Sequence, residues 1–229
     1  MAAEFSPRAA LLAGASGLVG QALLPLLLAS DAYGITHALL RRPLSDAHAR
    51  AKLRVHLVDF NALPTLPRLD DVYIALGTTI KVAGSEAAFR QVDFDAVVDT
   101  ARAARDAGAT RLAVVSALGA DAKAQVFYNR VKGEMQAAVS DMGYTSVVFA
   151  QPSLLLGNRA VLGQPRRSGE EWAMRLLGPV MAWVPRGVRP IAASAVAGAM
   201  VTAMHDGVAG VRVLSSAQMQ PERLFDPAR

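Results

Sequence analysis

The chain has 229 residues, of which 52% are hydrophobic and 19% are charged, and it contains four histidines and no cysteine. This length and composition are typical of a globular chain with a substantial core and exclude a disordered protein. The lack of cysteine excludes disulfides, thiolate zinc sites and cysteine nucleophiles, and no two histidines have the spacing of metal ligands, so we expect no metal site. The formal net charge is +5, but basic residues are scattered among acidic ones, and we expect no binding to nucleic acid.

The sequence gives no signal for export or membrane insertion. Its first residues carry no basic region followed by an apolar core and a cleavage site. The longest weakly polar stretch, 191–204, has 14 residues and is too short to span a bilayer. We therefore expect a cytoplasmic protein with no membrane partner.

Apolar strand patterns alternate with helical patterns over residues 9–150. The predicted strands are 9–13, 35–40, 53–58, 71–76, 111–115 and 146–150, and the predicted helices are 18–29, 85–107 and 125–142. Ser85 is a suitable N-cap, and Gly108 and Gly143 lie just past the second and third helices. Strands and helices at this interval form right-handed βαβ units, so the pattern predicts an α/β fold with a doubly wound parallel sheet, a Rossmann fold.

After Pro152 the pattern changes to loops rich in proline, glycine and arginine. Helical patches follow at 170–182 and 193–204, with a late strand at 210–214. We interpret residues 1–229 as a single domain, with its core at about 8–151 and a small C-terminal appendage, on the side of the substrate, at about 152–229.

A glycine turn joins the first strand to the first helix in the pattern G-x-x-G-x-x-G. Gly14 allows a tight turn, Gly17 lets the backbone approach a pyrophosphate, and Gly20 lets the helix pack close to the sheet. The helix N-terminus adds free N–H groups and the positive end of its dipole. The alternative is an ordinary strand–turn–helix that uses glycine. We favour dinucleotide binding, with the following residues in the site: Gly14, Ser16, Gly17, Leu18, Val19 and Gly20.

The end of the second predicted strand distinguishes NAD from NADP. NAD-binding sheets place an acidic residue there, about 20 residues past the glycines, to hold the ribose 2′-hydroxyl. Arg41 and Arg42 stand at that point in this chain. Guanidinium groups pair with a 2′-phosphate, which a carboxylate would repel, so the sequence predicts NADP(H).

Two further strand ends supply expected cofactor contacts. The pair after the third strand suits the adenine, because an aspartate there accepts from the exocyclic amine. Small residues after the fourth strand allow close approach to the middle of the cofactor. These expected contacts are Asp59 and Phe60 after the third strand, and Leu76, Gly77 and Thr78 after the fourth.

The expected chemistry lies in a Y-x-x-x-K pattern within the third predicted helix. Tyr128 and Lys132 are four residues apart, so their side chains share one helix face. A cation near the phenol lowers its pKa, which predicts that Tyr128 donates and accepts protons near neutral pH. Lys132 is also placed to hydrogen-bond the nicotinamide ribose. Ser116, at the end of the fifth strand, is expected either to orient a substrate carbonyl or only to cap the strand.

These motifs together resemble the atypical and extended short-chain dehydrogenase/reductase superfamily, and within it the Tat-interacting-protein oxidoreductase-like NAD(P)H-binding family. The resemblance covers about residues 9–172. It is carried by Gly14-Ala15-Ser16-Gly17, Arg41-Arg42, Val58-Asp59-Phe60, Leu76-Gly77-Thr78-Thr79, Ala83-Gly84, Val92-Asp93, Gly119-Ala120-Asp121, Lys132-Gly133-Glu134 and Gly169-Glu170 before Trp172. It implies a doubly wound sheet that binds NADPH, with cofactor roles for Ser16, Gly17, Arg41, Arg42, Leu76, Gly77, Tyr128 and Lys132, and with Leu154 and Leu155 near the nicotinamide.

The chain departs from the family pattern at two site positions. The family often has Ser-Ser after the fifth strand, where this chain has Ser116-Ala117. Its usual Arg-Pro after the sixth strand is Gln151-Pro152 here, which removes a cation. The segment 158–167 is longer than in the family, so Arg159 and Arg167 receive no role.

We predict an NADPH-dependent oxidoreductase that acts on an unidentified small carbonyl or hydroxyl compound. Two alternatives stay open: an NADPH-binding sensor or regulatory protein without turnover, and an enzyme similar to nucleotide-sugar epimerases or dehydratases. The helical patterns at 85–107 and 125–142 fit either a homodimer, as in other short-chain reductases, or packing against their own sheet.

Overall fold

A computed structural model describes residues 7–43, 51–156 and 185–221. Its main sheet has the strand order β3-β2-β1-β4-β5-β6-β9, and all neighbouring strands are parallel. This arrangement confirms the predicted doubly wound parallel sheet. The strands are β1 (Arg8–Ala13), β2 (Tyr33–Leu40), β3 (Leu53–Leu57), β4 (Asp71–Ile74), β5 (Arg111–Val115), β6 (Ser146–Gln151) and β9 (Gly210–Ser215). A separate parallel pair is formed by β7 (Leu155–Leu156) and β8 (Ile191–Ala192).

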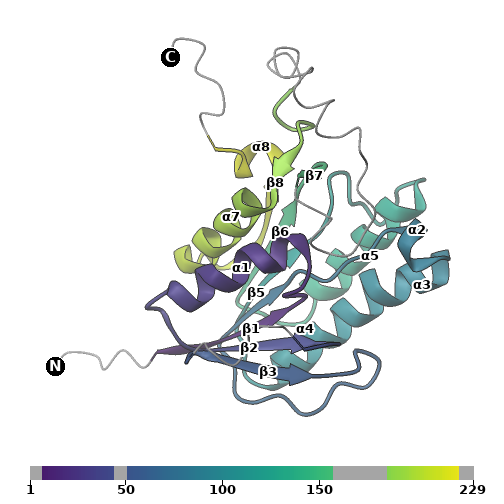
Figure 1. The fold of residues 1–229 in the computed structure, drawn as a ribbon. Helices are drawn as coiled ribbons and strands as arrows, with labels where there is room; N and C mark the ends of the chain where they lie inside the picture. The colour runs from purple at the N-terminus through teal and green to yellow at the C-terminus, as the bar shows by residue number, and fades with distance from the viewer. Residues whose placement is uncertain (1–6, 44–50, 157–184, 222–229) are drawn as a thin grey trace, which may run out of the picture.

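Helices cover both faces of the sheet (Figure 1). On one face lie α1 (Leu18–Ala29) and α7 (Ala193–Asp206), and on the other lie α4 (Ala96–Asp106) and α5 (Phe127–Ser140). The short helices are α2 (Ile80–Ala83), α3 (Glu86–Arg90) and α8 (Ser216–Met219). Among the described helices, none has the length and apolar character needed to cross a membrane.

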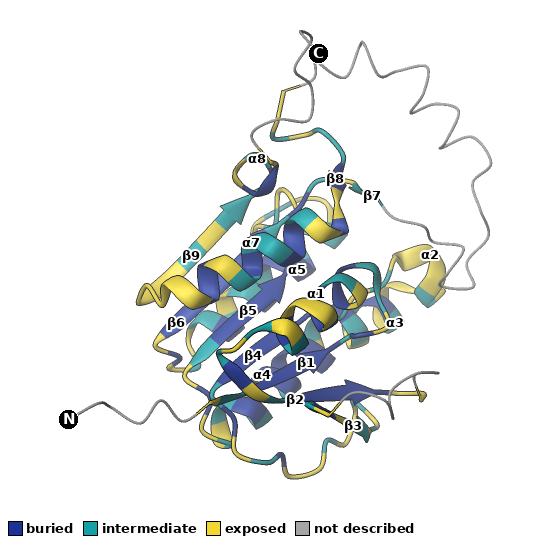
Figure 2. Ribbon diagram, turned by 60° about the vertical axis from the view of Figure 1, so that its left-hand side comes forward, coloured by how far each residue is buried: buried dark blue, intermediate teal, exposed yellow. Residues whose placement is uncertain are grey.

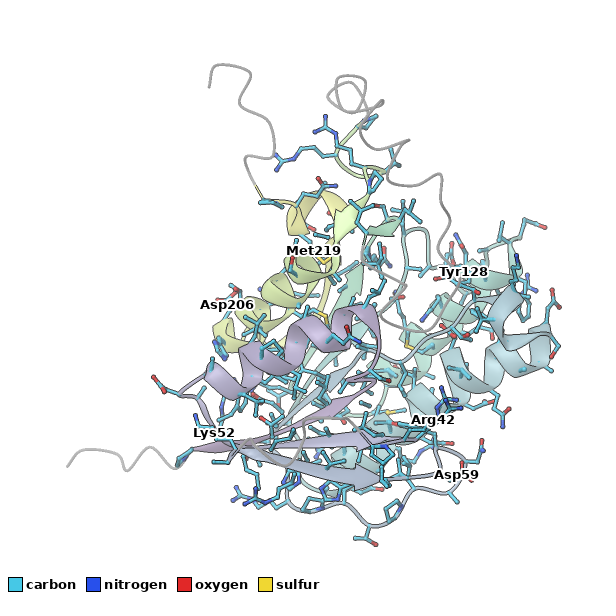
Figure 3. All side chains as sticks on the ribbon, in the orientation of Figure 1. Arg42, Lys52, Asp59, Tyr128, Asp206 and Met219 are labelled. Atoms are coloured by element: carbon cyan, nitrogen blue, oxygen red, sulfur yellow. The ribbon has the colours of Figure 1, made fainter. Side chains whose placement is uncertain are left out.

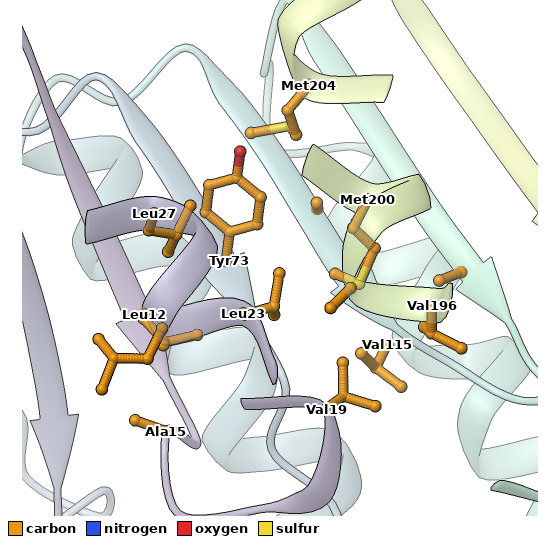
Figure 4. Packing of buried hydrophobic residues seen from close by; sticks show 14 of the residues in the cluster. Leu12, Ala15, Val19, Leu23, Leu27, Tyr73, Val115, Val196, Met200 and Met204 are labelled. Carbon is orange, nitrogen blue, oxygen red and sulfur yellow. The ribbon is translucent and has the colours of Figure 1, made fainter. Parts of the chain in front are cut away.

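Each face of the sheet has its own apolar core. Leu12 of β1 packs with Leu23 of α1 and Met200 of α7 on one side (Figure 4). Leu11 of the same strand packs with Val97 of α4 on the other side. Neighbouring strand residues point to opposite faces, so a strand that is covered on both faces needs an almost continuous apolar sequence. The central strands are accordingly buried, whereas the outer sides of the helices are exposed (Figure 2).

The second predicted helix, 85–107, differs from the structure in its middle. Its start is confirmed, because the Ser85 side chain accepts a hydrogen bond from the Ala88 amide at 3.1 Å. Gly108 has φ +101° just past its end. Between α3 and α4, however, the residues Gln91–Asp95 form a π-helical turn, η2, which apolar periodicity does not predict.

Part of the predicted C-terminal appendage belongs instead to the core. β9 pairs with β6 along its whole length, and α7 packs beside α1. Residues 193–215 therefore complete the sheet and one of its covering layers. The helical patch predicted at 170–182 lies outside the described residues.

The strand order has a switch point at β1, where we expect a binding crevice at the carboxyl edge of the sheet. From β1 the chain proceeds outward through β2 and β3, and β4 then lies on the other side of β1. At such a switch point the loops after the two central strands diverge, and ligands of open α/β sheets bind there, outside the carboxyl ends of the strands. The glycine turn after β1 and the loop after β4 meet at this point.

Candidate cofactor and active site

Two of the three glycines are required by the turn itself. Gly14 has φ +88°, and a Cβ there would lie 2.5 Å from the Ala75 carbonyl oxygen. A Cβ on Gly20 would lie 1.9 Å from the Gly14 carbonyl oxygen. At Gly17 a Cβ would meet only ordinary contacts, at 3.4 Å from the Gly14 oxygen and 3.6 Å from the Ala75 oxygen. The protein therefore leaves room for a Cβ at Gly17, and the fold by itself does not require glycine at that position.

The amino end of α1 fits the diphosphate of a dinucleotide. Gly17 is the N-cap, no side chain caps the helix, and its first turn contains no acidic residue. The predicted residues Leu18 and Val19 are the first two of the helix, and Ser16 lies in the turn before it, where its carbonyl accepts from the Gln21 side chain at 3.1 Å. Free backbone N–H groups and the helix dipole form a site for a phosphate group.

The predicted contacts to the adenosine end lie beside this turn. Arg41 and Arg42 are exposed and directly follow β2. Arg42 and Asp59 lie at the same end of the sheet as Tyr128, and Lys52 and Asp206 lie at the other end (Figure 3). The role of Arg41 and Arg42 toward a ribose 2′-phosphate stays a prediction.

The turn after β3 already uses a carboxylate oxygen that we expected to accept a hydrogen bond from the adenine. Asp59 is exposed, and its Oδ1 accepts from both the backbone and the side-chain nitrogen of Asn61 at 2.9 Å. Phe60 packs against the second core cluster at its edge. Asp59 therefore closes its own turn, and its predicted role toward adenine stays a prediction.

The loop after β4 reaches the second half of the site. Leu76 packs against the core, Gly77 is exposed, and the Thr78 amide donates to Asp93 Oδ2 at 2.8 Å. A Cβ on Gly77 would lie 3.3 Å from Asp93 Oδ1 and 3.9 Å from Lys132 Nζ. This loop therefore connects the expected cofactor crevice to the helices that carry the predicted chemistry.

The Tyr128–Lys132 face of α5 has a different electrostatic setting from the one we predicted. Lys132 Nζ lies 2.7 Å from Asp93 Oδ1, and both side chains are almost fully buried. Tyr128 packs on Phe89, with 5.3 Å between ring centroids. Burial and then the Asp93 carboxylate raise the pKa of Tyr128 to about 12. The predicted lowering of the Tyr128 pKa by Lys132 is therefore wrong for this structure, because Asp93 neutralises the lysine.

Ser116 is held in a small polar network behind this face. It is buried, and its Oγ accepts from Gln136 Nε2 at 2.5 Å. Gln151 Nε2 donates to Gln136 Oε1 at 3.4 Å. Gln136 follows Lys132 by four residues on α5, so the helix presents Tyr128, Lys132 and Gln136 along one side. The hydroxyl hydrogen of Ser116 is left free to donate.

The two leucines expected near the nicotinamide differ in their exposure. Leu154 is 61% exposed, whereas Leu155 begins β7 and packs against the first core cluster. Arg159 and Arg167 lie outside the described residues.

Sequence reasoning assigned no role to Asp93 or Gln136. Asp93 stands four residues after Phe89 and four before Val97, and both of these are fully buried. A carboxylate on the buried side of an amphipathic helix is the signal that could have identified it. Gln136 could have been found as the next residue on the Tyr128–Lys132 face.

Comparisons with known proteins place this geometry in a family. FMP52 of Lodderomyces elongisporus is 29% identical over 176 residues, which cover 72% of this chain and 73% of that protein. HTATIP2 of Rattus norvegicus is 31% identical over 170 residues, which cover 72% of this chain and 68% of that protein. The FMP52 relatives are named as mitochondrial proteins, and this finding overturns the prediction of a cytoplasmic protein.

Solved structures share the fold at low sequence identity. MoeE5 in complex with UDP-glucose and NAD superposes with a TM-score of 0.65 and 17% identity, covering 90% of this chain and 75% of that one. The ADP-L-glycero-D-manno-heptose-6-epimerase of Helicobacter pylori gives a TM-score of 0.66 and 16% identity, covering 94% of this chain and 79% of that one. A family model described as NAD(P)H-binding matches residues 14–151, which contain the glycine turn, Tyr128 and Lys132. The chain therefore belongs to the NAD(P)H-binding family, as an oxidoreductase-like domain with a Rossmann fold and with FMP52 and HTATIP2 among its relatives.

Proposed function

We propose that this protein is an NADPH-dependent oxidoreductase that interconverts a small carbonyl compound and its alcohol. The observation that carries the proposal is the position of Tyr128, Lys132 and Ser116. All three lie by the carboxyl edge of the sheet, the edge at which Gly17 opens the dinucleotide turn. A protein that only senses the cofactor has no need of a phenol, an ammonium and a hydroxyl at this place.

The residues of the chain suit the reductive direction. NADPH supplies a hydride to the carbonyl carbon when it is bound. With a pKa of about 12, Tyr128 stays protonated at neutral pH and serves as the donor of the proton that the carbonyl oxygen gains. Because Ser116 Oγ already accepts from Gln136, its own hydrogen is available to orient that oxygen. Hydride and proton together convert the carbonyl to an alcohol.

The preference for NADPH over NADH rests on Arg41 and Arg42. Both are exposed, they follow β2 directly, and no carboxylate stands beside them in the sequence. Charge-assisted hydrogen bonds from guanidinium groups to a phosphate are among the strongest polar contacts in proteins. A 2′-phosphate at this strand end would accept hydrogen bonds from both arginines.

Calorimetric titration with NADPH and with NADH tests the cofactor half of the proposal. We expect the wild type to prefer NADPH, and the Arg41→Ala/Arg42→Ala variant to bind NADPH on the order of 100-fold more weakly, since each charged hydrogen bond contributes about 1.5 kcal/mol or more. NADH binding should change little. The control is Arg68→Ala/Arg102→Ala, which removes two exposed arginines elsewhere. A wild type that binds neither dinucleotide contradicts the proposal.

A carbonyl panel tests the chemical half. Three large apolar side chains are exposed near the carboxyl edge after β5, before α5 and after β6: Leu118 at 40%, Val126 at 62% and Leu154 at 61%. We therefore favour aliphatic and aromatic aldehydes and ketones. NADPH oxidation should fall at least 100-fold in Tyr128→Phe, because general acid catalysis contributes a factor of this order, while NADPH affinity is kept. Binding of NADPH with no turnover of any compound would favour the regulatory alternative.

A further inference from the structure

The Asp93–Lys132 pair is unusual in its burial. The side chains of Lys132 and Asp93 are 3% and 1% exposed, and 2.7 Å separates Nζ from Oδ1. Taking two opposite charges out of water costs roughly as much free energy as their attraction returns, so a buried pair of this kind is weak support for stability. Its presence in the middle of the site indicates a role beyond holding two helices together.

The second oxygen of the same carboxylate holds the cofactor loop. Thr78, whose amide donates to Asp93 Oδ2 at 2.8 Å, belongs to the loop after β4. Gly77, the preceding residue, is exposed and has no side chain between the crevice and the pair. One carboxylate thus joins the loop after β4 on one side to the lysine of α5 on the other.

The backbone that carries Asp93 is itself irregular. Asp93 is the central residue of the π-helical turn Gln91–Asp95, which interrupts the run from α3 to α4. Such turns are rare within helices and occur frequently at functional sites. Phe89, one turn earlier, supports the Tyr128 ring, so the same stretch of helix contacts both residues of the predicted chemistry.

We propose that Asp93 is a positioning residue, which fixes the Lys132 ammonium and the Thr78 amide in one unit and places a negative charge near Tyr128. The proposal rests on the function proposed above and adds a residue that positions its groups. Two cations of the packed helices have partners of their own: Arg90 of α3 pairs with Glu134 of α5, and Arg130 of α5 donates to the carbonyls of Ala124 and Gln125.

The effect of the Asp93 charge on the pKa of Tyr128 has a defined direction. The Asp93 carboxylate disfavours a phenolate at Tyr128, and it also compensates the ammonium that would favour one. Removing the carboxylate charge therefore removes this repulsion and lowers the pKa of Tyr128. Removing Lys132 instead leaves the carboxylate alone and raises that pKa further.

The test uses the cofactor-free protein with its four tyrosines replaced by 3-fluorotyrosine. Fluorination lowers the ordinary pKa of a phenol, which brings the titration into a pH range in which the fold is kept, and the Tyr128→Phe variant assigns the fluorine NMR signal. In Asp93→Asn we expect the residue 128 signal to titrate below its wild-type midpoint, by less than about one pH unit, because burial is the larger cause of the raised pKa. In Lys132→Met we expect a higher midpoint. Asp99→Asn, which removes an exposed carboxylate of α4, should leave the midpoint unchanged.

A second arm uses NADPH as the probe of positioning. Asp93→Asn keeps an oxygen that accepts from the Thr78 amide, whereas Asp93→Ala does not, so NADPH affinity should decrease from wild type to Asp93→Asn to Asp93→Ala. An unchanged residue 128 midpoint in a folded Asp93→Asn protein would overturn the proposal, as would equal NADPH affinity in all three proteins when the wild type binds NADPH. Failure of the wild type to bind NADPH would count against the proposed function, while the fluorine titration would still decide the role of Asp93. If Asp93→Asn does not fold, the double variant Asp93→Asn/Lys132→Met removes both charges, and its midpoint should lie below that of Lys132→Met.

Discussion

Two buried aspartates differ in how their carboxylates are paired: Asp71 begins β4 at the amino edge of the sheet, and Asp93 lies in the helical turn η2 near its carboxyl edge. At the amino edge, Asp71 receives Arg111 Nε at 2.8 Å and Tyr33 Oη at 2.6 Å, with Arg8 Nη2 at 3.3 Å. At the carboxyl edge, Asp93 receives one amide and one ammonium. Asp71 is held by the first residues of β1, β2 and β5 together, whereas Asp93 is held by a loop and a single side chain.

This difference separates a structural cluster from the cluster that we propose to be functional. The donors around Asp71 leave no acceptor open to a ligand, and the Tyr33 hydroxyl also pairs with the Tyr73 hydroxyl at 2.8 Å. The pair at the carboxyl edge lies beside exposed Gly77, where the strand order opens the crevice. In parallel α/β sheets the carboxyl edge carries ligands, and the other edge is free to be closed for stability.

The largest effect on stability should come from breaking the amino-edge cluster. Asp71→Asn leaves Arg8 and Arg111 without their common carboxylate, and loss of one partner of a buried ion pair costs about 3 kcal/mol. Urea unfolding should show this loss, while the folded variant keeps the NADPH affinity of the wild type. Asp99→Asn, at an exposed pair with Arg102, should change stability by less than about 1 kcal/mol. Loss of NADPH binding in folded Asp71→Asn would show that the two edges are not separate.

A smaller effect, confined to ligand binding, should follow from Gly17→Ala. The protein has room for this methyl group, but a pyrophosphate that approaches the Gly17 backbone does not. We expect NADPH affinity to fall at least about tenfold, or 1.4 kcal/mol, with less than about 1 kcal/mol lost from the free energy of unfolding. Gly198→Ala is the matched control, because a Cβ there meets nothing within 4 Å. Unchanged NADPH affinity in Gly17→Ala would show that the glycine motif forms a structural turn and does not contact the pyrophosphate.

The smallest effect concerns a histidine pair between the two edges. His37 of β2 is buried and hydrogen-bonds His56 of β3 at 2.8 Å. Burial, then His56 and Arg54, lower the pKa of His37, so the folded protein resists its protonation. The unfolded chain binds this proton more readily, and stability falls as pH decreases below the ordinary histidine value of about 6.5. We expect the unfolding free energy of the wild type, minus that of His37→Gln, to decrease as the pH is lowered. Urea unfolding at several pH values measures this difference. A difference independent of pH would show that His37 is not held neutral.

Much of the fold was predictable from the sequence because its signals are local. Leu11 and Leu12 point to opposite faces of a strand, and their shared apolar character indicated a sheet covered on both sides. Ser85 and Gly108 marked the ends of a helical run through side-chain capping and positive φ. β9 was misplaced because nothing near it in sequence shows which strand it joins; its partner, β6, ends almost 60 residues earlier.

In the candidate site, too, features that depend on neighbouring residues were predictable, and features that depend on distant residues were not. The glycine turn and the arginines after β2 could be predicted as cofactor contacts because each motif depends on a few neighbouring residues. The spacing of Tyr128 and Lys132 also placed them correctly on one helix face. Their electrostatics were predicted with the wrong sign, because Asp93 reaches Lys132 from a different helix.

The sequence by itself determined most of the strands and helices, the glycine turn and the family, since these follow from periodicity and from motifs within a few residues. Only the tertiary structure decided which charges meet. Asp71 and Arg111 are 40 residues apart in the sequence, and the register of the parallel strands brings them together. Asp93 and Thr78 are 15 residues apart, and the extra residue in the π-helical turn places Asp93 to accept from the Thr78 amide. Such pairs depend on how βαβ units stack, and no local pattern encodes that arrangement.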